Sequence, residues 1–142
     1  GSLPSVVIRD TVADGNQALI AICKKELQTY GTVAILTRNM TESQHVFENI
    51  HRATNANLLS DADLALPKGV LIMPIYLAKG LEFDSVIAYN ISQNNYPDQS
   101  STGILYTMAS RAMHSLTLLS IGAASPLINE VVNDHEHLVQ IK

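Results

Sequence analysis

Several residue types are scarce in this 142-residue chain, and each scarcity excludes a class of protein. The single cysteine, Cys23, cannot form an internal disulfide, which excludes a small fold held together by disulfides. Nine lysine and arginine residues stand against 13 aspartate and glutamate residues, so the net charge of −4 provides no overall basic field to gather nucleic acid. No apolar run is long enough to span a membrane, and we expect no leader peptide. We therefore expect a cytoplasmic protein with no membrane contact.

Patterns of self-contained catalytic sites are also missing. The chain has no G-x-x-x-x-G-K-[ST] phosphate loop, so we expect that it does not hydrolyse ATP by itself. It has no G-x-S-x-G pattern beside its scattered histidines, so a hydrolase triad has little support. Residues 134–137, Asp-His-Glu-His, are better explained as a solvated charge cluster than as a metal site. We expect no metal site in the chain itself.

The length and the hydrophobic content predict one domain over residues 1–142. With 46% hydrophobic residues the chain can build one core, and it is too short for two comfortable ones. Strands are expected at short apolar or β-branched runs: residues 5–8, 32–37, 57–59, 69–73, 84–89 and 115–120. Helices are expected where apolar residues recur at helical spacing: residues 14–30, 41–50 and 102–112, with a last turn or helix from 126.

The alternation of strands and helices predicts an α/β fold. Such chains form a mostly parallel sheet with helices on both faces, and ligands bind at the carboxyl ends of the strands. Asp14 and Thr41 are the expected helix caps, with Gln17 and Gln44 as their reciprocal partners. Cys23 falls on the apolar stripe of the first helix, so we expect it in the core.

A charged turn separates two of the expected strands, in the stretch YLAKGLEFDSVIAYN (residues 76–90). Because this turn follows a strand, we expect Lys79 and Gly80 at the carboxyl edge of the sheet, where such folds bind phosphates. Gly80 would let a backbone amide approach an anion, Glu82 could accept hydrogen bonds from sugar hydroxyls, and Lys79 could neutralise charge. On spacing alone, a solvated turn anchored by its apolar neighbours is the commoner arrangement.

Arg111 is the second candidate functional residue. It lies near the end of the expected helix over residues 102–112, on the flank of the buried stripe. An arginine there can reach a phosphate held by another domain and act as an arginine finger. It can equally serve the dipole and the last carbonyls of its own helix, which is the commoner role.

Taken together, the two motifs resemble a known family. AKGLEFDSV followed by LYTMASRAMHSLTLL resembles motifs V and VI of superfamily 1 helicases of the UvrD/Rep/PcrA type, whose usual forms are close to KGLEFD-x-V and LLYVA-x-TRA-x-x-x-L-x-L. The resemblance covers residues 69–120 in order and spacing, and TVAILTRN upstream looks like the V-A-I-L-x-R strand of the same domain. YLAKGLEFD and SRAMH look closest to the HelD-like, helicase-IV-related branch found in Gram-positive bacteria.

The resemblance implies the C-terminal RecA-like domain, called 2A, of a larger motor. Its fold would be a P-loop NTPase-like three-layer sandwich without its own Walker A loop. In that family ATP and Mg²⁺ bind between two RecA-like domains, so the N-terminal RecA-like domain of the same polypeptide is the expected partner. Carried over, Arg111 would contact the γ-phosphate and Glu82 the ribose. Gly80 would let the backbone approach the phosphates, and Lys79 would have a supporting role.

Two positions depart from the family pattern. Motif V usually begins with Thr and has His two residues later, and both help to grip single-stranded DNA; here these positions are Pro74 and Tyr76. Tyr76 could stack on a base, or it could be a packed core tyrosine. Two functions therefore remain open. The first is an ATP-dependent helicase or translocase on single-stranded DNA, and the second is a HelD-like ATPase that remodels or recycles RNA polymerase.

Overall fold

Every neighbouring pair of strands in the central sheet runs parallel, in the order β3-β4-β2-β5-β6-β1-β7. The computed structural model describes residues 3–61, 65–133 and 140–141. Their strands are β1 (Ser5–Arg9), β2 (Thr32–Thr37), β3 (Asn57–Leu58), β4 (Gly69–Pro74), β5 (Phe83–Tyr89), β6 (Ala112–Ile121) and β7 (Gln140–Ile141). The apolar runs of β2 and β4 are buried almost throughout, as covered parallel strands require. The predicted mostly parallel sheet is confirmed.

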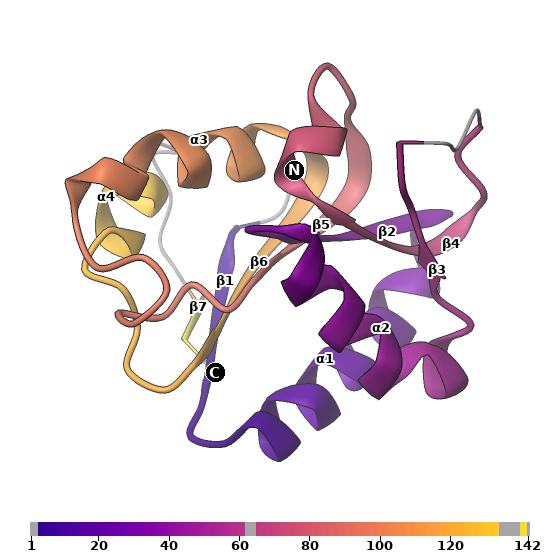
Figure 1. Cartoon of the computed structure of the whole chain (residues 1–142), viewed down its shortest axis with the longest axis horizontal. Coiled ribbons are helices and arrows are strands. Elements are labelled where there is room, and N and C mark those ends of the chain that lie inside the picture. The colour runs from indigo at the N-terminus through magenta and orange to yellow at the C-terminus, as the bar shows by residue number, and fades with distance from the viewer. Residues whose placement is uncertain (1–2, 62–64, 134–139, 142) are drawn as a thin grey trace.

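Helices cover both faces of this sheet, which makes the fold a three-layer sandwich (Figure 1). The helices α1 (Val12–Leu27) and α2 (Met40–Thr54) pack on one face, and their core includes Leu19, Val46 and Ile50. The helices α3 (Thr102–Ser110) and α4 (Ile128–Asn133) pack on the other face through residues such as Leu105 and Val131. Two short 3₁₀ helices, η1 (Ile75–Ala78) and η2 (Gln99–Ser101), complete the described elements.

Cys23 lies in the core beneath α1, as predicted, with no exposed surface. Burial, and then the nearby charge of Glu26, raises the pKa of the Cys23 thiol to about 12. A thiol with such a pKa stays protonated near neutral pH, so Cys23 is a packing residue. No helix among the described residues has the length and apolar character needed to cross a membrane.

The start of α1 differs from the prediction. Thr11, not Asp14, is the N-cap: its backbone is extended, and its side-chain oxygen accepts a hydrogen bond from the Asp14 amide at 3.1 Å. The helix therefore begins at Val12 and holds Asp14 in its first turn, where a negative charge favours the helix dipole.

The start of α2 is shifted in the same way. The predicted capping box of Thr41 and Gln44 is wrong, because Asn39, two residues after the end of β2, has extended backbone and caps the helix instead. Asn39 Oδ1 accepts from the Glu42 amide at 2.9 Å, and Glu42 Oε1 accepts from the Arg38 amide at 2.9 Å. The helix entry is thus a reciprocal cap placed two residues earlier than the sequence pattern suggested.

The connection from α3 to β6 is tighter than predicted. We expected the helix to reach residue 112 and the strand to begin at 115, but α3 ends at Ser110 and β6 begins at Ala112. Arg111 is the single residue between them. Its carbonyl bonds to the first residue of β5, so the backbone leaves the helix here in order to join the sheet.

Candidate functional site

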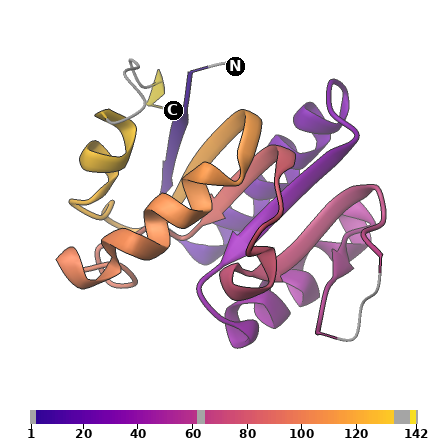
Figure 2. The same cartoon turned by 90° about the horizontal axis from the view of Figure 1, so that it is seen from above.

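The segment after β4 crosses the sheet from one end to the other. Since β2 pairs in parallel with both β4 and β5, these two strands start at the same end of the sheet. β4 ends at Pro74 and β5 begins at Phe83, so residues 75–82 return from the carboxyl end to the amino end. The return lies on the face that carries α3 (Figure 2). Ala78 of η1 is fully buried there, in the core.

This path corrects the predicted location of Lys79 and Gly80. We expected both residues at the carboxyl edge of the sheet, because they follow a strand. Instead they lie beside the amino ends of β5 and β6. They follow Ala78, whose carbonyl accepts a hydrogen bond from Arg111, and they precede Phe83, the first residue of β5. The loop after a parallel strand cannot remain at that strand's end when the next parallel strand begins at the opposite end.

Arg111 is held at the same place by backbone and side-chain contacts. The Phe83 amide donates to the Arg111 carbonyl at 2.8 Å, which joins the starts of β5 and β6. The guanidinium Nη1 donates to the Ala78 carbonyl at 3.5 Å, and Nη2 donates to Ser110 Oγ at 3.1 Å. The Arg111 Nε atom is buried and has no hydrogen-bond partner. The side chain is half-buried, with one donor unpaired and another in a long, weak bond.

The structure brings Lys79, Gly80, Glu82 and Arg111 together. Lys79, Gly80 and Glu82 are exposed, and all lie close in sequence to the bond between Phe83 and Arg111. Gly80 has φ +78°, a left-handed conformation that side chains rarely adopt, and nothing lies within 4 Å of the position that its Cβ would take. Conformation rather than crowding explains this glycine, and its backbone borders open space.

Tyr76 lies apart from these residues. It follows Pro74, the residue that ends β4 in register with Thr37, so it stands near the carboxyl end of the sheet. The tyrosine is 56% exposed, so the packed core tyrosine that the sequence left open is wrong.

Known proteins resemble this arrangement in sequence and in structure. Residues 69–119 match the family model of the UvrD-like helicase C-terminal domain. The crystal structure of the C-terminal domain of a possible DNA helicase from Lactobacillus plantarum WCFS1 is 33% identical, with a TM-score of 0.88. That similarity covers 99% of this chain and 86% of the other.

The chain belongs to the UvrD-like helicase C-terminal domains.

More distant structures show how widely the fold of this UvrD-like domain is shared. The C-terminal domain of the DEAD-box protein Dbp5 has a TM-score of 0.68 at 13% identity, over 98% of this chain and 89% of that one. The Pyrococcus furiosus Hef helicase domain has a TM-score of 0.65 at 15% identity, over 97% of this chain and 34% of that one. The predicted RecA-like fold is therefore confirmed. A search of curated protein sequences gave no match.

Sequence reasoning missed a polar cluster at the carboxyl end of β2 in this UvrD-like domain. Arg38 Nη1 donates to the Asn95 carbonyl at 2.8 Å and to Ser101 Oγ at 3.1 Å, and the guanidinium lies 4.8 Å from the centre of the Tyr96 ring. Glu42 Oε2 accepts from Asn95 Nδ2 at 3.0 Å. These contacts anchor the loop before α3. The only sequence signal was Arg38, which matches the arginine of the V-A-I-L-x-R strand.

Burial dominates the electrostatics of this cluster. It raises the pKa of the Glu42 carboxyl, although hydrogen bonds from the Arg38 amide and the Asn95 side chain oppose the rise. It also raises the pKa of the Tyr96 hydroxyl. The Arg38 cluster is satisfied within the domain, so we assign it a structural role.

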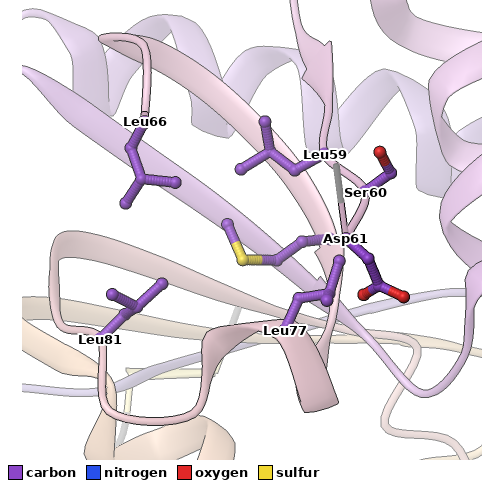
Figure 3. Close-up of a pocket in the computed structure, with 7 residues that line it drawn as sticks. Leu59, Ser60, Asp61, Leu66, Leu77 and Leu81 are labelled. Atoms are coloured by element: carbon purple, nitrogen blue, oxygen red, sulfur yellow. The ribbon is translucent and has the colours of Figure 1, made fainter. Parts of the chain in front are cut away.

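A small pocket lies beside the crossing segment and is distinct from the Arg111 region (Figure 3). Its volume is about 210 Å³, and it is lined mostly by apolar side chains: Leu59, Ser60, Asp61, Leu66, Met73, Leu77 and Leu81. Its lining contains no basic side chain and includes the carboxylate of Asp61, so it is poorly suited to phosphate. Figure 3 shows Leu77 and Leu81 entering it from the crossing segment.

Metal ligands are not gathered in the described part of the chain. No group of three or more histidine, cysteine, aspartate or glutamate side chains there could hold a metal ion. Residues 134–137, which the sequence analysis assigned to a solvated cluster, lie outside the described residues.

Proposed function

We propose that this UvrD-like domain completes the ATP site of a larger superfamily 1 DNA helicase or translocase, working in the cytoplasm. Arg111 would act as the arginine finger, Glu82 as the ribose contact, and Gly80 and Lys79 as neighbours of the phosphates. The observation that carries the proposal is the meeting of two sequence motifs at one place. The Phe83 amide bonds to the Arg111 carbonyl at 2.8 Å, and the Arg111 side chain reaches the Ala78 carbonyl at 3.5 Å.

The residues present fit one side of a nucleotide site. The Arg111 guanidinium has a buried, unpaired Nε–H, and planar guanidinium donors suit phosphate oxygens. Glu82 offers an exposed carboxylate to ribose hydroxyls, and Gly80 offers backbone that no side chain covers. The sequence has no Walker A loop, so in this proposal the N-terminal RecA-like domain holds Mg²⁺ and most of the triphosphate.

The chemistry assigned to this chain is electrostatic. ATP supplies the phosphoanhydride bond that is broken, and negative charge spreads over the oxygens of the transferred phosphoryl group in the transition state. Arg111 would place its fixed positive charge against those oxygens. Its contact with the Ala78 carbonyl is long, so turning the guanidinium toward a phosphate would cost little.

Single-stranded DNA is the proposed partner at the other end of the crossing segment. Tyr76 is 56% exposed near the carboxyl end of β4, and an exposed aromatic ring can stack on an unpaired base. Residues 75–82 would then connect a nucleic-acid contact directly to the nucleotide contacts.

The test uses the full-length protein that contains this domain together with its N-terminal RecA-like domain. Arg111→Ala should reduce steady-state ATP hydrolysis about a thousandfold or more while leaving nucleotide binding nearly intact, since a finger acts mainly in the transition state. Arg52→Ala is the matched control, because Arg52 is an exposed arginine on α2. Normal hydrolysis in Arg111→Ala would refute the finger assignment.

Pro74 and Tyr76 favour a second candidate, because they replace the Thr and His that usually grip DNA in motif V. A HelD-like ATPase would remodel or recycle RNA polymerase instead of unwinding DNA. Adding single-stranded DNA and RNA polymerase separately to the hydrolysis assay distinguishes the two. Stimulation by DNA supports the translocase, whereas stimulation by the polymerase alone supports the remodelling ATPase.

A further inference from the structure

On the face of the sheet that α1 covers, one carboxylate joins β5 and β6. These are the two strands that directly follow the candidate site residues. Glu26, in the last turn of α1, accepts hydrogen bonds at Oε1 from Ser85 Oγ at 2.9 Å and from Ser115 Oγ. Ser85 belongs to β5 and is fully buried, whereas Ser115 belongs to β6 and is half-buried. The two serines are partners in the register of the sheet. One carboxylate oxygen therefore ties these strands together near their amino ends.

The strand pairing is irregular just before this tie. Phe83 pairs with Ala112 and Ser85 pairs with Ser115, so β6 has one more residue than β5 between the two pairs. An extra residue of this kind bends its strand and redirects neighbouring side chains. The irregularity lies directly between the Glu26 tie and Arg111.

The segment that follows α1 contacts the irregular pairing itself. Tyr30 stacks on His114 with ring centroids 5.9 Å apart and planes 3° from parallel. His114 Nε2 lies 3.8 Å from Asp84 Oδ1. Glu26 thus holds β5 and β6 from the α1 face, while the Ala78 carbonyl contacts Arg111 from the other.

A purely structural role does not require a carboxylate here. Glu26 is partly buried, and withdrawing a charged group from water costs free energy unless hydrogen bonds compensate it. Three apolar side chains would fill a helix-to-sheet contact without that cost. Glu26, Ser85 and Ser115 instead form a directional contact with a defined geometry. Directional contacts of this kind fix the relative position of the groups that they join.

We infer that Glu26 is a positioning residue for the site: by tying Ser85 to Ser115, it fixes the separation of Glu82 and Arg111. The inference rests on the proposed function of those two residues. Without the tie, the irregular pairing next to Arg111 has more freedom, and both the finger and the ribose contact move from their working positions.

The test compares Glu26→Ala and Glu26→Gln in the full-length protein, with steady-state kcat and KM for ATP as readouts. Glu26→Ala should lower kcat about tenfold or more and raise KM about threefold or more, because displacements near 1 Å have effects of this order. Glu26→Gln keeps an oxygen acceptor at the same position and should restore both constants to within about threefold. Glu48→Ala, at an exposed glutamate of α2, is the control and should match the unaltered protein.

The readouts separate positioning from loss of folded protein. A smaller folded fraction lowers apparent kcat and leaves KM unchanged, so a rise in KM that Glu26→Gln reverses supports positioning. Unaltered constants in Glu26→Ala beside an inactive Arg111→Ala would overturn the inference and leave the proposed function intact. Full activity in Arg111→Ala would overturn the proposed function itself.

If Glu26→Ala does not fold, Ser115→Ala tests the positioning role instead. Ser115 is half-buried and forms one arm of the tie, so its loss should lower kcat and raise KM by about two- to fivefold. Unchanged constants in Ser115→Ala would then overturn the inference.

Discussion

The Phe83 amide donates a hydrogen bond to the Arg111 carbonyl at 2.8 Å, and this contact joins the two motifs through residues 28 positions apart in sequence. Phe83 begins β5 directly after the charged turn, and Arg111 precedes β6 directly after α3. The candidate nucleotide residues therefore stand on two neighbouring strand starts. Their spacing depends on the sheet, so substitutions there should affect nucleotide chemistry and stability differently.

Gly80→Ala should destabilise the domain by about 1–2 kcal/mol, because alanine is strained in a left-handed conformation. Gly80 has φ +78° and open space around its Cβ position, so the effect comes from the backbone alone. Gly103→Ala is the control: Gly103 lies in α3 with equally open space, and alanine there should stabilise by about 0.5–1 kcal/mol. Urea unfolding of both variants measures the difference. Equal changes in the free energy of unfolding would show that the backbone at position 80 adjusts to alanine without strain.

Tyr76→Ala should weaken binding of single-stranded DNA by the full-length protein about five- to a hundredfold, because one stacked base contributes about 1–3 kcal/mol. Tyr76→Phe keeps the aromatic ring and should bind normally. The side chain is 56% exposed, so neither change should alter thermal stability much. Fluorescence anisotropy with a labelled oligonucleotide reports the affinity, and unchanged binding by Tyr76→Ala would remove the residue from the nucleic-acid path.

Arg38→Ala should lower the free energy of unfolding by about 2–3 kcal/mol. The substitution removes hydrogen bonds to the Asn95 carbonyl and Ser101 Oγ, and the contact with the Tyr96 ring. Arg52→Ala removes an exposed arginine and should change stability by less than about 0.5 kcal/mol. Urea denaturation of both variants checks this. A loss as small as that of the control would mean that the loop before α3 is anchored by its other contacts.

Glu42 should make stability depend on pH in the direction opposite to a carboxylate whose pKa is lowered on folding. Burial raises its pKa above the ordinary value of 4.5, so the folded state binds the proton more tightly than the unfolded state. Stability from this group is then fully present below pH 4.5 and is lost as the pH rises through the raised pKa.

Glu42→Gln removes this titration and isolates its effect. The stability of the unaltered chain relative to Glu42→Gln should fall as the pH rises from about 4 toward neutrality. Urea unfolding across that range, at constant ionic strength, provides the comparison. A relative stability that increases with pH would show that hydrogen bonds to the carboxylate outweigh its burial.

Much of the fold could be predicted because its signals are local. Runs such as residues 33–36 and 70–73 are apolar throughout, and only a covered parallel strand explains them well. Helix starts were less predictable, since Asn39 and Thr41 are both suitable caps. Asn39 is the cap because it follows the end of β2 by two residues and has extended backbone.

The candidate site was predictable in its members but not in its location. The motifs KGLEFD and SRA identified Lys79, Gly80, Glu82 and Arg111, whereas no sequence pattern indicated Glu26. The carboxyl edge was the wrong expectation for the charged turn, because the general rule assumes that a loop stays at the end of the strand before it.

The sequence by itself determined the alternation of strands and helices, the family, and the residues that the two motifs contain. These follow from apolar periodicity and from short motifs, which are readable within a few neighbouring positions. The tertiary structure decided that residues 75–82 cross the sheet, that Phe83 bonds to Arg111, and that Glu26 ties β5 to β6. Each of these depends on strand order and on which face a segment packs against, and both arise from contacts between residues far apart in the chain.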